Sequence, residues 1–202
     1  EKYHADWVIN VDADEFWWTP LRNLKKAIGN YPHNNIIYVP LKNMVPEEGL
    51  TWIEWSNVVL NSIENYEVEG LSKYSLYRSP IPKVIHRTQF YQIISRGNHQ
   101  VQMLFEASVL SKDIMIYHYP IRGYKHFENK TIRGGEAYLH NPNKTQGVHW
   151  RFWYSLYQKG ALINEFSRVI GIDKISDFKK RGIIGTDIRF LKYLRVVCNN
   201  SK

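Results

Sequence analysis

Short apolar runs, broken by turn residues, alternate along this chain with stretches of helical periodicity. Runs rich in β-branched and aromatic residues predict strands at 7–11, 35–41 and 113–119. The first run, WVINV, has no regular polar alternation, so we expect it to be covered on both faces, as in a parallel α/β sheet. Two further strands are expected at 84–95 and 100–105, paired across a short Arg-Gly-Asn turn in which the glycine takes a positive φ.

Helices are expected where apolar residues recur every three or four positions. The expected ranges are 19–29, 124–133, 150–160 and 186–197. The first should begin with Thr19 as the cap and Pro20 in the first turn, and end at Gly29. Between the second predicted strand and residue 57, the segment 44–55 is expected to be an irregular loop that carries acids and two tryptophans.

The last two predicted helices each have a distinct face. In the third, four aromatic residues share one side: Trp150, Trp153, Tyr154 and Tyr157. In the last, Ile188, Leu191 and Leu194 are expected to point inward, with three basic residues beside them: Arg189, Lys192 and Arg195. The ordinary interpretation is an amphipathic core helix; the alternative is a surface that rests on anionic lipid.

Composition is that of one globular domain. The 202 residues are 44% hydrophobic and 23% charged, which suffices for a core of ordinary size. The apolar runs are far shorter than the roughly 20 residues that cross a bilayer, so we expect no membrane span and see no leader. The single cysteine, Cys198, is consistent with a reducing compartment.

The net charge of +8 favours an anionic partner. Nucleic acid, a phospholipid surface and a phosphorylated small molecule all satisfy this charge. No recognised nucleic-acid motif is present and acids occupy the most distinctive segment, so nucleic acid is the least favoured of the three.

That segment is WVINVDADEFWW, in which an apolar run ends in Asp12, Asp14 and Glu15. If the chain stays extended, the two aspartates point the same way, because side chains alternate along a strand. Two such carboxylates suit Mg²⁺ or Mn²⁺, and a solvated acidic turn is an equal alternative. A calcium EF-hand is excluded because Phe16 and Trp17 stand where an oxygen ligand and glycine are needed. The residues that accompany the acids in haloacid-dehalogenase-like phosphatases and in polymerase-β-like nucleotidyltransferases are also absent from this sequence.

VINVDADEFW closely resembles the Asp-x-Asp segment of family-2-like glycosyltransferases with the GT-A fold, in the bacterial branch that reads Asp-x-Asp-Glu-Phe. Two further blocks carry the resemblance: GNHQV at 97–101 and IYHYPIRGYKHFENK at 116–130. The resemblance implies an α/β fold with a GT-A-like mixed sheet flanked by helices. It also implies transfer of a sugar from a nucleotide-sugar donor to a saccharide or lipid-linked acceptor, with inversion.

The resemblance assigns roles to individual residues. Asp14 corresponds to the direct metal ligand, Asp12 to a metal or ribose/sugar contact, and His118 to an added histidine ligand for Mn²⁺ or Mg²⁺. Arg122 suits a phosphate by its fork geometry. Lys125, Lys130 and Arg133 either neutralise the donor diphosphate or form a solvated basic face. Asn98 and His99 either face a sugar or serve the turn.

The catalytic base is not fixed by the sequence. The Glu-Asp dipeptide usual in the family is absent downstream. Five residues are candidates for the group that takes the acceptor proton: Glu15, Glu47, Glu48, Glu128 and His99.

In the family, a longer stretch that builds the nucleoside-binding βαβ units precedes the Asp-x-Asp strand. Here only six residues precede Trp7, and the chain opens with Glu1. We therefore expect the C-terminal two-thirds of one transferase domain, inactive alone, with 1–135 as the metal, donor and acceptor core and 136–202 as a helical part.

The expected setting is bacterial surface polysaccharide or lipopolysaccharide synthesis, in the cytoplasm or peripherally on the inner face of the membrane. The alternative is a non-catalytic sugar-binding or interaction domain built on a transferase scaffold.

Overall fold

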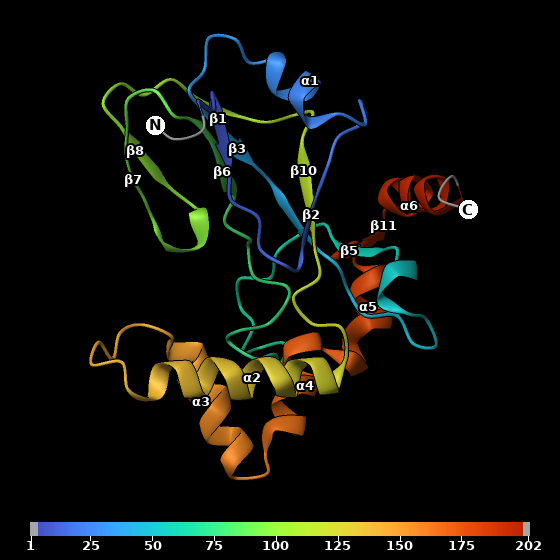
Figure 1. The fold of residues 1–202 in the computed structure, drawn as a ribbon. Coiled ribbons are helices and arrows are strands. Elements are labelled where there is room, and N and C mark those ends of the chain that lie inside the picture. The colour runs from blue at the N-terminus through green and yellow to red at the C-terminus, as the bar shows by residue number, and fades with distance from the viewer. Residues whose placement is uncertain (1–3, 200–202) are drawn as a thin grey trace. The chain divides into compact units, whose positions relative to one another are not determined.

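Short strands and amphipathic helices give this chain a mixed α/β architecture of small sheets and helices (Figure 1). The structure is a computed structural model that describes residues 4–199, and side chains as far as 197. Glu1 and the Cys198 side chain, which entered the sequence-based expectations, lie outside this described part.

The chain divides into two compact units, each made of two separate stretches. Unit 1 comprises residues up to Asn43 together with Pro80–His118, and unit 2 comprises Met44–Ser79 together with residues from Tyr119 onward. The organisation as one transferase domain, split near residue 135, stays a prediction.

Unit 1 contains a mixed sheet with the strand order β1-β6-β3-β9. The strands are β1 (Trp7–Ile9), β6 (Lys83–Arg87), β3 (Ile36–Val39) and β9 (Ser108–Leu110). Strand β6 runs antiparallel to both of its neighbours, and β9 is parallel to β3. Helix α1 (Leu24–Gly29) contributes Ala27 and Ile28 to a buried core that includes Ile37 and Ile85.

A second sheet in unit 1 positions Glu15, Asn43 and His118. Its central strand, β10 (Met115–His118), is antiparallel to β2 (Glu15–Trp18) and parallel to β4 (Leu41–Asn43). The register sets His118 opposite Glu15 on one side and opposite Asn43 on the other. Side chains from three distant parts of the chain therefore meet at one end of this sheet.

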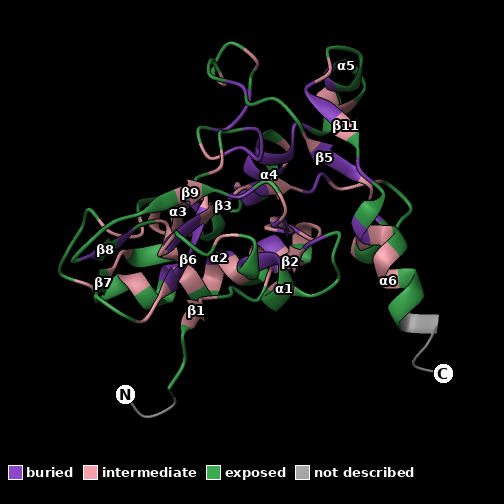
Figure 2. Ribbon diagram, turned by 90° about the horizontal axis from the view of Figure 1, so that it is seen from above, coloured by how far each residue is buried: buried purple, intermediate pink, exposed green. Residues whose placement is uncertain are grey.

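The remaining strands of unit 1 form an antiparallel pair, β7 (Tyr91–Ile94) and β8 (Val101–Met103). They are joined through the 3₁₀ turn η2 (Arg96–Asn98), where Gly97 has a φ of 72°. The predicted pairing and the positive glycine φ are both confirmed. Strand β7 is largely exposed, as its green colour in Figure 2 shows.

Unit 2 is mainly helical. Its helices are α2 (Tyr124–Leu139), α3 (Val148–Gln158), α4 (Leu162–Ile170), α5 (Ile175–Lys180) and α6 (Arg189–Asn199). Short 3₁₀ turns, η1 (Trp52–Glu54) and η3 (Ile172–Lys174), and a two-stranded sheet of β5 (Asn57–Val59) and β11 (Ile184–Thr186) complete it. Its core combines aliphatic residues with buried aromatic rings, among them Tyr77, Phe127, Trp153 and Phe178.

The predicted strands mostly lie where strands are found, but the first of them pairs differently from the prediction. The strand predicted at 7–11 ends at Ile9, pairs antiparallel with β6 and is only half-buried, so the parallel, doubly covered arrangement was wrong. The strand predicted at 84–95 is interrupted by a turn in which the N–H of Tyr91 donates to the Thr88 carbonyl and Phe90 has a φ of 66°. Strand β10 lies inside the range predicted at 113–119.

Three helix predictions need correction at their ends. The first helix begins at Leu24 with Asn23 as its cap, because Arg22 takes a φ of 53° that interrupts helical geometry after Thr19. Helix α2 continues beyond residue 133 to Leu139. The last helix begins at Arg189 rather than at 186, so Ile188, which was expected to point inward from it, precedes the helix and is 41% exposed, while Phe190 is buried.

No helix among the described residues is both long and apolar enough to cross a bilayer.

Candidate functional site

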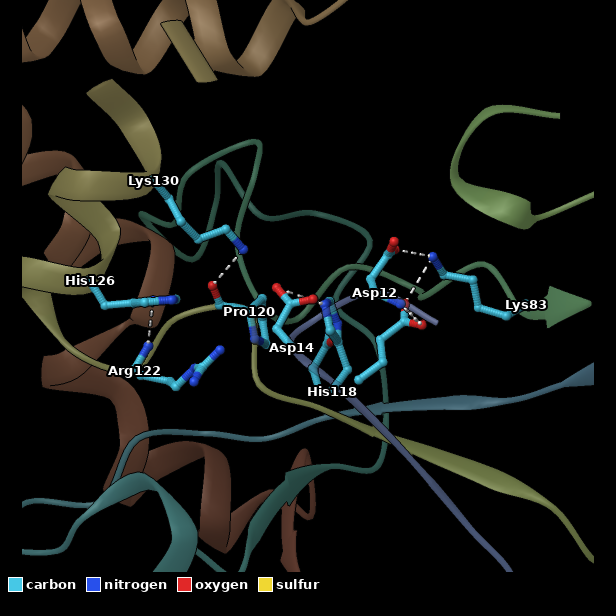
Figure 3. A network of polar contacts seen from close by, with 10 residues as sticks. Asp12, Asp14, Lys83, His118, Pro120, Arg122, His126 and Lys130 are labelled. Atoms are coloured by element: carbon cyan, nitrogen blue, oxygen red, sulfur yellow. Dashed lines mark hydrogen bonds and ion pairs between the residues drawn. The ribbon is translucent and has the colours of Figure 1, made fainter. Parts of the chain in front are cut away.

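The acidic segment forms a turn between β1 and β2. The backbone N–H of Glu15 donates to the Asp12 carbonyl at 3.0 Å, so the chain does not stay extended through the aspartates. The expectation that Asp12 and Asp14 point the same way is therefore wrong: Asp12 contacts Lys83, and Asp14 lies beside His118. In Figure 3, the Lys83 side chain reaches Asp12 while the Asp14 carboxylate is turned toward the His118 ring.

Lys83 neutralises two of the three carboxylates. Its Nζ lies 2.6 Å from Asp12 Oδ2 and 2.8 Å from Glu15 Oε1. Lys83 and Glu15 are both buried, whereas the Asp12 side chain is 51% exposed. A buried carboxylate needs such a counter-charge, so Lys83 explains how Glu15 can follow an apolar strand.

The protonation of this cluster follows from burial and charge. Burial raises the pKa of Glu15, and its hydrogen bond and attraction to Lys83 act in the opposite direction without cancelling that rise. For Lys83, burial lowers the pKa, but the hydrogen bonds with Asp12 and Glu15 outweigh this effect and the net pKa is raised. Lys83 is therefore a firmly charged ion-pair partner and is unsuited to act as an amine nucleophile.

Asp14 and His118 form a second polar pair. The Nδ1 of His118 lies 2.8 Å from Asn43 Oδ1, and because a carbonyl oxygen only accepts, Nδ1 carries the proton. The other ring nitrogen, Nε2, lies 3.8 Å from Asp14 Oδ2. This separation is too long for a hydrogen bond, and it places a nitrogen ligand and an oxygen ligand side by side.

The pair fits a divalent cation that is held only partly by protein. Within the described part of the chain, no three His, Cys, Asp or Glu side chains form a group that could hold a metal ion. Mg²⁺ commonly takes one or two protein ligands and fills its other positions with phosphate oxygens and water. Asp14 could supply such a carboxylate, and His118 would add an imidazole, a ligand that suits transition metals better than Mg²⁺. The hydrogen bond to Asn43 orients that ring in the way that metal ligands usually require.

The second resemblance block contacts the residue before β6, the strand that begins with Lys83. His99 donates through Nδ1 to the carbonyl of Pro82, at 3.0 Å, directly before Lys83. Its ring lies over Gly97, where an added Cβ would be 2.9 Å from the ring atoms. Asn98 has a φ of 59° in the same turn. All three blocks thus contribute side chains to unit 1: the acids, His99 and His118.

Four other predicted site residues belong to unit 2. Arg122 precedes α2 and lies with its guanidinium carbon 4.8 Å from the centre of the Trp52 ring. Lys125 and Glu128, on the first turns of α2, pair with each other at 2.7 Å. That pairing, rather than burial, lowers the pKa of Glu128 and gives the carboxylate a local partner. Lys130 donates to the Pro120 carbonyl at 3.2 Å (Figure 3).

The alternative bases Glu47 and Glu48 also lie in unit 2. One oxygen of Glu47 accepts from the backbone N–H of Ser56 and, at 2.9 Å, from that of Asn57. Glu48 is exposed. Glu47 therefore fixes the entry to β5.

Sequence reasoning missed Lys83 and Asn43. Lys83 lies 71 residues from Asp12 in the sequence. It follows a proline in the motif Ile-Pro-Lys-Val, and a lysine at the start of an apolar strand is the one local sign that it needs an acidic partner. Asn43 ends β4 and lies beside His118 through parallel pairing, which no local pattern reveals. No known family model matches this chain, and comparison with curated proteins finds no significant match.

Proposed function

We propose that this protein is a metal-dependent glycosyltransferase that moves a sugar from a nucleotide-sugar donor to a saccharide or lipid-linked acceptor, with inversion. The observation that carries the proposal is the Asp14–His118 pair, in which a carboxylate oxygen and an imidazole nitrogen lie 3.8 Å apart. The resemblance to family-2-like glycosyltransferases with the GT-A fold adds support. The biological setting proposed is bacterial surface polysaccharide or lipopolysaccharide synthesis.

In this proposal Asp14 and His118 hold Mn²⁺ or Mg²⁺, and Asn43 keeps the His118 ring in the tautomer that ligation requires. The cation, when bound, would stabilise the negative charge that develops on the departing nucleoside diphosphate. Lys83 holds Asp12 and Glu15 in place beside the pair. Glu15 is an unfavourable base because it is buried in this ion pair.

Among the candidate bases, His99 has the most suitable local chemistry. Its Nδ1 proton is directed to the Pro82 carbonyl, so the neutral ring offers Nε2 as the basic nitrogen. Glu128 is engaged by Lys125 and Glu47 by backbone N–H groups. We therefore propose His99 as the group that takes the proton from the acceptor hydroxyl.

The test is Asp14→Asn, which keeps the size of the side chain and removes its charge. Calorimetry should show that Mn²⁺-dependent binding of a nucleoside diphosphate weakens at least tenfold, while circular dichroism stays unchanged. Glu106→Gln, an exposed change of the same kind in unit 1, serves as the control and should bind normally. Unchanged Mn²⁺ affinity in Asp14→Asn would rule the site out.

A non-catalytic sugar-binding domain is the second candidate function. The observation that favours it is the engagement of Asp12 and Glu15 by Lys83, which leaves few carboxylates for chemistry. Donor turnover against a panel of nucleotide-sugars with Mn²⁺ separates the two. Sugar binding without turnover would favour the second candidate.

A further inference from the structure

Unit 2 contains a pocket that the proposed metal pair does not use. Its volume is about 910 Å³, and every residue that lines it belongs to this unit. Small-molecule sites typically enclose about 300–1,000 Å³ and combine apolar walls with a few polar groups. This pocket has the size and the mixed lining of such a site.

One part of the lining is apolar. Trp55, Phe166 and Ile170 are buried residues that contribute to it, and Ile172, which also lines the pocket, is 50% exposed. Side chains of this kind bind the hydrocarbon or ring part of a ligand by removing its apolar surface from water. An exposed isoleucine beside a cavity is also a position where apolar surface remains for a ligand to cover.

The charged residues of the lining differ in their exposure and in their hydrogen-bond partners. Arg122, Lys179, Glu47 and Glu48 all line the pocket. The Glu47 carboxylate accepts hydrogen bonds from two backbone N–H groups, which hold it in place and leave its negative charge. Glu48 and Lys179 are both exposed and therefore well solvated. Of the two cations in the lining, the partly buried one is the guanidinium of Arg122.

Arg122 has a donor without an acceptor. Its Nε is buried and makes no hydrogen bond with any residue in the described part of the chain. The guanidinium carbon lies 4.8 Å from the centre of the Trp52 ring, which restrains the side chain. Buried polar groups are normally hydrogen-bonded, and a guanidinium fork binds two oxygens of a phosphate or carboxylate together. Because this Nε is shielded from solvent, an anion in the pocket would bind the part of the Arg122 guanidinium that lines it.

We infer that this pocket binds an organic anion that has an apolar body and one phosphate or carboxylate group, with the oxyanion on Arg122 and the body against Phe166, Ile170 and Ile172. The inference does not depend on the proposed transferase activity, because it uses none of the residues of the Asp14–His118 pair. It predicts binding without any divalent metal.

The experiment is calorimetric titration of the whole chain with octyl phosphate, below its micelle concentration and in the presence of a chelator. Octyl phosphate should bind at least tenfold more tightly than inorganic phosphate or 1-octanol, because only the first satisfies both parts of the pocket. A parallel titration with octanoate shows whether the pocket prefers a carboxylate or a phosphate head group. Arg122→Gln should weaken octyl phosphate binding at least tenfold, and Ile172→Asn severalfold.

Two controls separate this pocket from other charges and from the metal pair. Lys125→Gln removes a nearby exposed cation that does not line the pocket, and Asp14→Asn removes the proposed metal ligand; both should bind octyl phosphate within twofold of the original protein. If Arg122→Gln fails to fold, methyl NMR of the original protein replaces it, and the resonances of Ile170 and Ile172 should shift on titration. The inference is overturned by absent binding, by inorganic phosphate binding equally well, or by loss of binding in Asp14→Asn.

Discussion

At the scale of single residues, Lys83 is the side chain on which the acidic turn depends. We predict that Lys83→Met lowers the free energy of unfolding by about 3–5 kcal/mol at pH 7.5, because it leaves Glu15 charged and buried without a partner. The pKa of Glu15, already raised by burial, should rise further in the variant. The loss should therefore be largest above that pKa and shrink as the pH falls, since a protonated Glu15 needs no counter-charge.

Denaturant unfolding of Lys83→Met at pH 7.5 and at pH 5 measures this effect. The double variant Lys83→Met with Glu15→Gln should recover most of the lost stability at pH 7.5, because neither charge is then buried alone. A single variant as stable as the original protein at both pH values would contradict the role given to Lys83.

At the scale of elements, the contact between α2 and α3 depends on two glycines. A Cβ on Gly135 would lie 2.3 Å from Tyr154 Cγ, and one on Gly134 would lie 2.5 Å from Trp150 Cδ2. We predict that Gly135→Ala destabilises the protein, because overpacking costs about 1–3 kcal/mol and exceeds the helix preference of alanine, worth up to about 1 kcal/mol. The Cβ and Cγ atoms of Tyr154 lie next to the backbone of α3, so they cannot move away from Gly135 by side-chain rotation alone.

Thermal unfolding compares Gly135→Ala with Gly29→Ala. Gly29 also lies in a helix, at its last position, but has open space where a Cβ would stand, so alanine there should leave the melting temperature unchanged or slightly higher. Equal melting temperatures for the two variants would show that the helices can separate without cost.

At the scale of the whole molecule, the two units have separate hydrophobic cores. Phe178 is fully buried in unit 2, with its ring centre 4.8 Å from that of Tyr77, and Ile85 is fully buried in unit 1. We predict that Phe178→Ala, which should cost about 3–5 kcal/mol, lowers hydrogen-exchange protection mainly in unit 2. Ile85→Ala, the matched change, should act mainly on unit 1. Equal loss of protection across both units in either variant would mean that they unfold as one.

Local sequence determined where most elements lie. The apolar run at 113–119 contains β10, the aromatic spacing at 150–157 lies within α3, and the Arg-Gly-Asn turn joins two paired strands. These features depend on periodicity and backbone preference over a few residues, which the sequence carries directly. The sequence also singled out Asp14 and His118 for one site, through resemblance and residue type, and they lie 3.8 Å apart.

Only the tertiary structure decided how these parts pair. The antiparallel pairing of β1 with β6 joins residues almost eighty positions apart in sequence, and the neutralisation of Asp12 by Lys83 spans 71. Whether a carboxylate meets a metal, water or a lysine is set by which distant side chain the fold brings to it. Strand preference alone does not choose a neighbour, so the sequence could name the acids but not Lys83 or Asn43 as their partners.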